Sequence, residues 1–365
     1  MKQTGITAPE GFLAGGIACG IKKSGKPDLA VIYSEVPAVA AGVFTANQYK
    51  AAPIIVSMEQ IKSKSCRAII SNAGNANCGT GKKGIEDAKL MVKTAAEVFN
   101  INSKQILVTS TGSIGKQLPM DKIVGGIKNL KATKDGGSDM AQAILTTDTR
   151  KKEIALDMGG YTIAGVAKGS GMIHPNMATM HCFITTDAKI EKSTLQKLLK
   201  KAVENSFNMI TVDQCMSTND CVFVLANGMS GVKPKENDFY TGLEKVCKYL
   251  AIEIARDGEG ATQLIIVNVS GAKNEKEAKT AARAIAGSDL LKCAVYGKDY
   301  NLGRIYAAVG ATSVKMDAGK IKADMKFGEK ETIIICDLGA GYARAQAWGC
   351  DMTEGYVKIN ADYHT

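Results

Sequence analysis

The stretch Lys168-Gly169-Ser170-Gly171-Met172-Ile173-His174-Pro175-Asn176-Met177-Ala178-Thr179-Met180 places small and conformationally restricted residues directly before a threonine. A threonine hydroxyl is a weak nucleophile unless a base lies beside it, and one such base is the α-amino group that appears when the chain is cut before the threonine. The two glycines can adopt backbone angles that other residues avoid, and Pro175 fixes a further angle. The segment therefore indicates a strained Ala178–Thr179 bond that is open to attack by the Thr179 hydroxyl. The alternative from the residues alone is a Gly/Ser/Pro turn that leads into a strand.

Short β-branched segments alternate with segments of helical periodicity along the rest of the chain. The expected strands are Leu29–Ser34, Arg67–Asn72, Gln105–Thr111, Cys182–Thr186, Asp220–Ala226, Leu264–Ser270, Lys292–Tyr296 and Thr332–Asp337. The expected helices are Asp87–Phe99, Met120–Leu130, Ser193–Ser206, Asn237–Ala255 and Glu275–Ile285, of which the third begins with a capping box, Ser193-Thr194-Leu195-Gln196. This order predicts an α/β fold but does not determine its topology.

The composition is that of a globular chain with ample length for a buried core. Of its 365 residues, 45% are hydrophobic and 22% are charged. No apolar run is long enough to span a bilayer and the start of the chain lacks the pattern of a secretory signal, so a cytoplasmic location is expected. The ten cysteines include no Cys-x-x-Cys pair, and Cys221, Cys293 and Cys336 lie in apolar runs, so they are expected to be small buried residues. The three histidines show no ligand spacing, so no metal is predicted.

The net charge of +10 is concentrated in the first half of the chain. Residues 1–178 contain 22 Lys and Arg against 13 Asp and Glu, whereas residues 179–365 contain 24 against 23. A basic half is one sign of nucleic-acid binding, but Arg150-Lys151-Lys152 is the longest basic run and only 5% of the residues are aromatic. A solvated basic surface that attracts small carboxylates is therefore expected, and a basic RNA-binding protein is the alternative.

Glycine-rich segments give no clear nucleotide site. Gly79-Thr80-Gly81-Lys82-Lys83-Gly84 has the spacing of a dinucleotide fingerprint, but the strand expected before it ends near Asn72, too early for a tight strand-to-helix turn. The sequence contains no P-loop, GxSxG elbow or HExxH motif. We therefore expect chemistry without a cofactor.

A series of blocks, in the same order, resembles the ornithine acetyltransferase family, also called glutamate N-acetyltransferases. The segment around Ala178–Thr179 resembles the self-cleavage site of that family. Further blocks are Gly42-Val43-Phe44-Thr45, Ser71-Asn72-Ala73-Gly74-Asn75-Ala76-Asn77, Thr109-Ser110-Thr111-Gly112, Thr146-Thr147-Asp148-Thr149, Ser217-Thr218-Asn219-Asp220, Ala255-Arg256-Asp257-Gly258-Glu259-Gly260-Ala261-Thr262, Ala347-Trp348-Gly349-Cys350-Asp351 and Asn360-Ala361-Asp362-Tyr363-His364-Thr365. The resemblance covers nearly the whole chain. It implies layered sheets and helices, and self-cleavage into an α chain, residues 1–178, and a β chain, residues 179–365, that form one catalytic unit.

The resemblance also implies roles for individual residues. Thr179 would be the nucleophile, and Thr111 with Gly112 would form the oxyanion hole, where a hydroxyl and a backbone N–H face the oxygen of a tetrahedral intermediate. The implied substrate-binding residues are Thr146, Lys168, Thr179, Glu259, Asn360 and Thr365. Thr147 is the alternative to Thr146, because a misalignment by one residue would exchange them. Without the resemblance, Lys168 would be a surface lysine and Glu259 would belong to a solvated turn.

The implied activity is that of an acyltransferase in arginine biosynthesis, which moves acetyl from N2-acetyl-L-ornithine to L-glutamate through an acetyl-threonine intermediate. Members of the family differ in whether acetyl-CoA also supplies acetyl. The reactive thioester and the basic first half favour a bifunctional enzyme. The alternatives are an enzyme without acetyl-CoA activity and a self-cleaving aminopeptidase, in which water resolves the acyl-enzyme. The family further implies a heterotetramer of two α and two β chains, and we expect no nucleic-acid or membrane partner.

Three places in the sequence, one of them a single residue and two of them short segments, depart from the pattern of the family. His181 stands where an apolar residue is usual, Cys215-Met216 where residues are smaller and more polar, and Tyr300-Asn301-Leu302-Gly303-Arg304 where Pro-Asn-Trp-Gly-Arg is usual. None of them removes a catalytic group, so they bear on substrate preference and not on the reaction.

Overall fold

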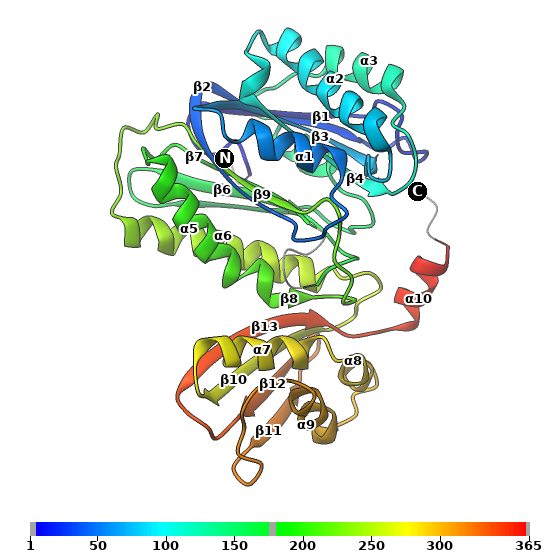
Figure 1. The fold of residues 1–365 in the computed structure, drawn as a ribbon, viewed down its shortest axis with the longest axis vertical. Coiled ribbons are helices and arrows are strands. Elements are labelled where there is room, and N and C mark those ends of the chain that lie inside the picture. The colour runs from blue at the N-terminus through cyan, green and yellow to red at the C-terminus, as the bar shows by residue number, and fades with distance from the viewer. Residues whose placement is uncertain (1–4, 175–179, 363–365) are drawn as a thin grey trace.

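Two mixed β-sheets, with helices between and around them, make up the fold (Figure 1). The computed structural model describes residues 5–174 and 180–362. The α/β class expected from the sequence is confirmed, with the helices and sheets arranged in layers.

The first sheet has eight strands in the order β4-β3-β2-β9-β7-β6-β5, with β1 paired to β2. Its strands are β1 (Phe12–Ile17), β2 (Leu29–Phe44), β3 (Cys66–Asn75), β4 (Ile106–Ser113), β5 (Lys152–Asp157), β6 (Thr162–Lys168), β7 (His181–Thr186) and β9 (Cys221–Ala226). The long strand β2 joins the two parts of the sheet, because its first half pairs with β3 and its second half with β9. The central strands β7 and β9 are buried along their whole length, as expected for strands covered on both faces.

The second sheet has five strands in the order β11-β12-β10-β13-β8. They are β8 (Ile210–Thr211), β10 (Leu264–Ala272), β11 (Lys322–Phe327), β12 (Glu331–Asp337) and β13 (Ala343–Cys350). Side chains alternate between the two faces of a strand, and on β10 the apolar Ile265, Val267 and Val269 are buried in the largest core. The other face of β10 carries Asn268 and Ser270, which are only half-buried.

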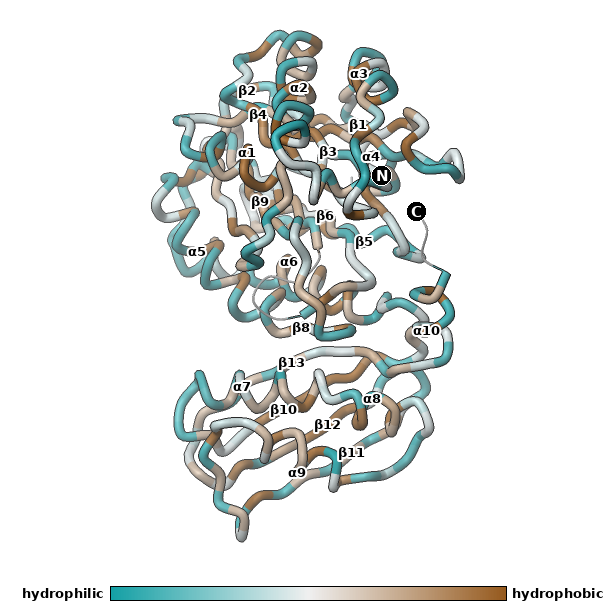
Figure 2. The backbone as a smooth tube through the Cα atoms, turned by 45° about the vertical axis from the view of Figure 1, so that its right-hand side comes forward, coloured by the Kyte–Doolittle hydropathy of each residue, from teal (hydrophilic) through white to brown (hydrophobic). Residues whose placement is uncertain are grey.

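The helices pack on both sheets and between them. They are α1 (Ala52–Gln60), α2 (Gly81–Phe99), α3 (Met120–Asn129), α4 (Gly137–Ala143), α5 (Lys192–Glu204), α6 (Glu236–Arg256), α7 (Glu275–Ala286), α8 (Asp289–Tyr296), α9 (Leu302–Gly310) and α10 (Glu354–Ala361), with 3-10 turns η1 (Ser103–Gln105) and η2 (Phe207–Met209). Helix α6 contacts β5 and β6 of the first sheet and β8 and β13 of the second, so it bridges the two. Figure 2 shows the two parts one above the other, with α10 at their side. In the part of the chain that is described, no helix is both long and apolar enough to cross a membrane.

The strand expected at Lys292–Tyr296 is wrong, because these residues belong to helix α8. Leu291, Ala294 and Val295 are buried at helical spacing, and the Ser288 hydroxyl caps the helix by accepting the Leu291 N–H at 3.4 Å. A short apolar run does not by itself distinguish a strand from a buried helix face. As a consequence Cys293 is exposed, contrary to expectation, whereas Cys221 and Cys336 are buried.

The capping box expected at the start of α5 is also wrong. The helix begins at Lys192, its N-cap residue is Glu191, and no side-chain hydrogen bond caps it. Its apolar face is nevertheless the expected one, since Leu195, Leu198 and Leu199 are buried.

Candidate functional site

A cavity of about 270 Å³ lies where β4 and β6 end, and we call it the central pocket. Six of the residues that the sequence assigned to the site line it together: Thr111, Gly112, Thr146, Lys168, Glu259 and Asn360. They come from both sides of the expected cleavage point. Thr147, the sequence alternative to Thr146, also lines the pocket. Ala178, Thr179 and Thr365, which the sequence assigned to the same site, lie outside the described residues.

Thr111 and Gly112 stand at the end of β4, where it runs parallel to β3. Gly112 has a φ of 130°, and a Cβ at this position would overlap the backbone of Gly74 and Asn75. The position therefore requires glycine for its conformation and for the close approach of the two strands. Thr111 is buried, and its Oγ1 accepts a hydrogen bond from the Lys168 ammonium at 3.4 Å.

Lys168 ends β6 and is buried, so its interpretation as a surface lysine is wrong. Burial lowers the pKa of this ammonium, and the carboxylates of Asp148, Asp220 and Glu259 oppose that shift. A buried charge needs such compensation, because water cannot solvate it. Acidic groups from three different segments therefore offset part of the cost of burying this charge.

A buried network of Asp148, Lys152 and Asp257, which we call the charged hub, lies next to the residues that line the central pocket. The Lys152 ammonium lies 2.8 Å from Asp148 Oδ1 and 2.5 Å from Asp257 Oδ2, with essentially no exposed side-chain surface on any of the three. Burial by itself would raise the pKa of Asp148, but the ammonium groups of Lys152 and Lys168 outweigh it and lower the pKa below its ordinary value. Lys152 belongs to the basic run that we expected to be a solvated surface, and for this residue the expectation is wrong.

The charged hub is linked through the backbone to Thr146, Lys168 and Glu259 of the central pocket. Asp148 accepts the N–H of Thr146 at 3.0 Å and that of Gly169, next to Lys168, at 2.6 Å. Asp257, two residues before Glu259, accepts the Thr149 N–H at 3.1 Å. Sequence reasoning missed this network, although Asp148 and Asp257 both lie inside the blocks that carry the resemblance.

The segment that precedes the expected cleavage point wraps around Glu259. Gly169 has a φ of 152°, a backbone angle that other residues avoid, as expected. Gly171 has no positive φ, whereas Met172 has a φ of 57°. At Gly171 the constraint is different, since a Cβ there would meet the Glu259 carboxylate, which would have to move. Asn360 of α10 donates to Glu259 Oε2 at 2.8 Å, which closes this side of the pocket.

A second set of buried polar groups lies where the described chain resumes at Met180. Asp220 Oδ1 accepts the Met180 N–H at 2.8 Å, and burial raises the pKa of Asp220. The His181 ring contacts the Asn219 carbonyl through Nε2 at 3.2 Å, and burial lowers the pKa of His181 to about 3, so the ring is neutral and Nε2 must carry its proton. Asn219, which sequence reasoning did not assign to the site, lines the pocket and donates to the Ala76 and Ser110 carbonyls, both at 2.7 Å.

The glycine-rich loop at residues 79–84 is filled by its own side chains. Strand β3 extends to Asn75, further than expected, and α2 begins at Gly81. Thr80 Oγ1 donates to Asn77 Oδ1 at 2.8 Å, and Asn77 Nδ2 donates to the Gly84 carbonyl at 2.9 Å. These hydrogen bonds tie the turn to Asn77, at the end of the preceding segment. Among the described residues, no group of three or more His, Cys, Asp and Glu side chains is placed to hold a metal ion.

The model of the ArgJ family matches residues 13–328 and 315–365 of the chain. The arginine biosynthesis bifunctional protein ArgJ of Caldanaerobacter subterraneus is 47% identical, over 99% of this chain and 98% of that protein. The protein of the same name from Dehalococcoides mccartyi is 46% identical, over 99% of this chain and 97% of its own length. Among solved structures, ornithine acetyltransferase from Mycobacterium tuberculosis, complexed with ornithine, is 38% identical, covers 48% of this chain and 96% of its own, and has a TM-score of 0.46. The arginine biosynthesis bifunctional protein ArgJ of Bacillus halodurans is 43% identical over 48% of this chain and 94% of its own, with a TM-score of 0.44.

Proposed function

Because the chain belongs to the ArgJ family, we propose that it is an acyltransferase of arginine biosynthesis, which moves an acetyl group from N2-acetyl-L-ornithine to L-glutamate. The products are L-ornithine and N-acetyl-L-glutamate. The observation that carries the proposal is the convergence of Thr111, Gly112, Lys168 and Glu259 on the central pocket. One amide forms as another is broken, so the exchange requires no ATP.

The reaction proceeds through an ester on Thr179. The Thr179 hydroxyl oxygen attacks the acetyl carbonyl carbon, and the Thr179 α-amino group takes the hydroxyl proton as general base. The C–N bond of acetylornithine then breaks, the proton passes to the leaving amine, and ornithine departs. The amine of glutamate attacks the acetyl-threonine ester in the same way, which restores the hydroxyl and releases N-acetylglutamate.

Thr111 and Gly112 stabilise the oxyanion that forms in both steps. The Lys168 ammonium has only donors, so in its contact with Thr111, at 3.4 Å, the hydroxyl oxygen accepts. The Thr111 proton therefore remains free to point toward the substrate oxygen, beside the Gly112 N–H. Two preorganised donors in a buried site are the usual arrangement for this task.

The polar ends of the substrate are bound by the residues at the rim of the pocket. Glu259 receives the side-chain ammonium of ornithine, and Asn360, which donates to the same carboxylate, keeps it in place. Thr146 and Lys168, which both line the pocket, bind the carboxylate end. Thr365 completes the binding set that the resemblance implies.

Acetyl-CoA is a second acetyl donor in this proposal, which makes the enzyme bifunctional. The names of the curated relatives support it, since each is a bifunctional protein of arginine biosynthesis. The acyl-threonine is the same whichever donor loads it, and a thioester is the more reactive of the two. The full-length similarity to these proteins also supports an enzyme over an RNA-binding protein.

The chain matures by cleavage between Ala178 and Thr179 into the α chain, residues 1–178, and the β chain, residues 179–365. Strand pairing supports their lasting association, because β2 pairs with β9 and β6 with β7 across the cleavage point. The assembly we propose is a heterotetramer of two α and two β chains, as the resemblance implies. Light scattering on the purified protein should then give about twice the 38.5 kDa of one chain.

An assay with and without glutamate tests the reaction. The purified, processed protein should convert acetylornithine and glutamate to ornithine and acetylglutamate in equal amounts, and should release little acetate when glutamate is absent. A second arm replaces acetylornithine by acetyl-CoA and should also form acetylglutamate. Acetate at the same rate with and without glutamate would instead identify a hydrolase, the aminopeptidase alternative. Product from acetylornithine but none from acetyl-CoA would make the enzyme monofunctional.

A further inference from the structure

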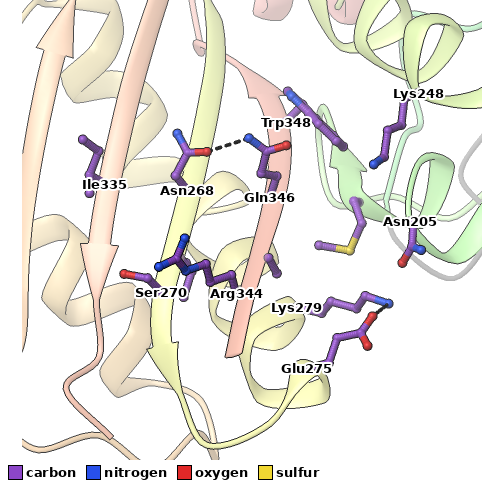
Figure 3. A pocket seen from close by; sticks show the side chains of 13 residues that line it. Asn205, Lys248, Asn268, Ser270, Glu275, Lys279, Ile335, Arg344, Gln346 and Trp348 are labelled. Atoms are coloured by element: carbon purple, nitrogen blue, oxygen red, sulfur yellow. Dashed lines mark hydrogen bonds and ion pairs between the residues drawn. The ribbon is translucent and has the colours of Figure 1, made fainter. Parts of the chain in front are cut away.

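A second and larger cavity, of about 670 Å³, lies on the second sheet, and we call it the sheet pocket (Figure 3). Its wall includes Asn268 and Ser270 of β10 and Arg344, Gln346 and Trp348 of β13. The two pockets have no lining residue in common. The chemistry proposed above therefore leaves this cavity without a role, although its volume is in the range of small-molecule sites.

The cavity exists because strand β13 is covered unequally. Ala343, Ala345 and Ala347 pack in or against the largest core, and side chains alternate along a strand, so Arg344 and Gln346 project from the opposite face. Trp348 lines the cavity but is itself buried against that core. On its other edge β13 pairs with β8 only at Trp348 and Gly349. The first half of β13 consequently lies open to the space between the second sheet and the residues of α6 and η2.

Three cationic side chains and a single carboxylate line this space. Lys279 is paired with Glu275 at 2.6 Å, and Lys248 is more loosely paired with Glu244 at 3.6 Å. Arg344 makes no hydrogen bond or ion pair with any residue that the structure describes. Figure 3 shows Lys248 and Lys279 on one side of the cavity and Arg344 on the other. The amides of Asn268 and Gln346, joined at 2.7 Å, lie side by side on the neighbouring strands β10 and β13.

We propose that the sheet pocket binds a small organic anion with at least two negative charges, carried by carboxylate or phosphate groups. A guanidinium presents a rigid fork of N–H donors that matches both groups, and Arg344 has this fork free. On the opposite side Lys279 is neutralised by Glu275, but Lys248 is paired with Glu244 only at 3.6 Å and offers a second cation. A ligand with two separated charges can therefore span the cavity. The Asn268 and Gln346 amides offer donors and acceptors to the neutral middle of the ligand, against the flat wall of Trp348.

The two pockets are connected through β8, which determines how binding must be tested. Trp348 pairs with Ile210, and three residues further on Asp213 accepts the Met172 N–H, in the wall of the central pocket, at 2.6 Å. A change in Trp348 fluorescence alone therefore does not show which of the two pockets an anion occupies. The experiment has to separate the two sites.

Trp348 is the single tryptophan of the chain, so its fluorescence reports on the sheet pocket. The processed protein is titrated at constant ionic strength with citrate, with inorganic pyrophosphate and, as a monovalent control, with acetate. We expect a saturable change in fluorescence with citrate or pyrophosphate and none with acetate. Whichever of the two probes binds with the lower Kd shows whether carboxylate or phosphate is the preferred group. Saturating acetylornithine, which occupies the central pocket, should not displace the probe. Calorimetric titration with the same probes provides a readout that does not depend on the tryptophan.

Substitutions assign the binding to the cavity. Arg344→Gln should weaken binding about tenfold or more, the effect of losing a charged hydrogen-bonding group, and Lys248→Gln on α6 should weaken it independently. Lys326→Gln, an exposed lysine on β11 of the same sheet outside the lining, is the matched control and should bind as the wild type does. Absence of saturable binding in both readouts would overturn the proposal. So would displacement by acetylornithine, or equal weakening in Lys326→Gln, which would reduce the effect to the overall positive charge.

Discussion

Lys168 of the central pocket and Arg344 of the sheet pocket stand in opposite environments. In the central pocket Lys168 is buried, nearby acidic groups offset part of the cost of burying its charge, and its ammonium is bonded to Thr111. In the sheet pocket Arg344 is exposed and has no partner among the described residues. A reacting group has to be held in one geometry. An unpaired cation, in contrast, is available to bind an anionic ligand. Substitutions should therefore be costly in the first pocket and nearly free of catalytic effect in the second.

The largest effect is expected at the nucleophile. Thr179→Ala removes the hydroxyl that attacks both the chain and the substrate, so the protein should remain a single chain of 38.5 kDa and transfer no acetyl. A denaturing gel with N-terminal sequencing measures the cleavage, and the wild type should give a second chain that begins at Thr179. If the Thr179→Ala chain were still cut after Ala178, another group would be the nucleophile. The assignment of the reaction to the central pocket would then be contradicted.

The next largest effect is expected at the oxyanion hole. Thr111→Ala should lower kcat by about 10²- to 10³-fold, the usual loss for one missing donor, with far smaller changes in KM. Cleavage has to be verified first, because an uncut variant would be inactive for a different reason. Thr109→Val is a matched control on the same strand: its buried hydroxyl has no hydrogen-bond partner in the described structure, so turnover should persist. Normal turnover in processed Thr111→Ala protein would remove this residue from the mechanism.

The charged hub should affect catalysis from outside the pocket. Asp148→Asn keeps the size of the side chain but removes the charge that holds Lys152 and the N–H groups of Thr146 and Gly169. Small displacements of binding groups reduce rates by up to about 10²-fold, so we expect kcat/KM to fall between about 10- and 10²-fold in a variant that is still processed. Kinetics on the cleaved, folded variant measure this. An unchanged kcat/KM would show that the hub stabilises the fold without positioning the site.

The same substitution predicts a dependence of stability on pH. The pKa of Asp148 is lowered below its ordinary value of 3.8, so its ionised form stabilises the folded state above that value, and this contribution is lost as the pH falls toward the folded pKa. The difference in unfolding free energy between wild type and Asp148→Asn should thus be constant near neutrality and shrink below pH 3.8, by at most about 1.4 kcal/mol per pH unit. Urea unfolding at several acidic pH values measures it. A difference that grows as the pH falls would contradict the assigned direction.

The sequence predicted the central pocket better than it predicted the topology around it. Thr111, Gly112, Thr146, Lys168, Glu259 and Asn360 lie in local blocks that can be recognised without knowing where the strands run, and the fold brings them to one cavity. The pairing of β2 with both β3 and β9 depends on residues far apart in the chain, which no local pattern contains. The strand expected at Lys292–Tyr296 failed for a related reason, because periodicity over five residues does not show which face is buried.

The charged hub shows a further limit of sequence reasoning. Lys152 belongs to a basic run, and such runs are usually solvated, but its two acidic partners are supplied by Asp148 nearby and by Asp257 at the end of α6. Only the folded arrangement shows that the three charges are buried together. The sheet pocket is hidden in the same way, since Arg344 and Gln346 look like the outward face of an ordinary strand.

The smallest catalytic effect is expected at the sheet pocket. Arg344→Gln removes one charge, as Asp148→Asn does. Unlike Asp148, however, Arg344 has no bond to another described residue that the substitution would break, and the new side chain remains at the surface. Surface substitutions of this kind change stability by about 0.5 kcal/mol or less, and β8, the connection to the central pocket, is held by backbone pairing at Trp348 and not by Arg344. In buffer without polyvalent anions, kcat and KM for acetylornithine and glutamate should therefore stay within about twofold of wild type, which corresponds to a change of less than about 0.5 kcal/mol in the activation free energy. A tenfold loss of kcat in processed Arg344→Gln protein would mean that the guanidinium takes part in the transfer reaction, and the contrast between a compensated and a free cation would no longer separate the two pockets.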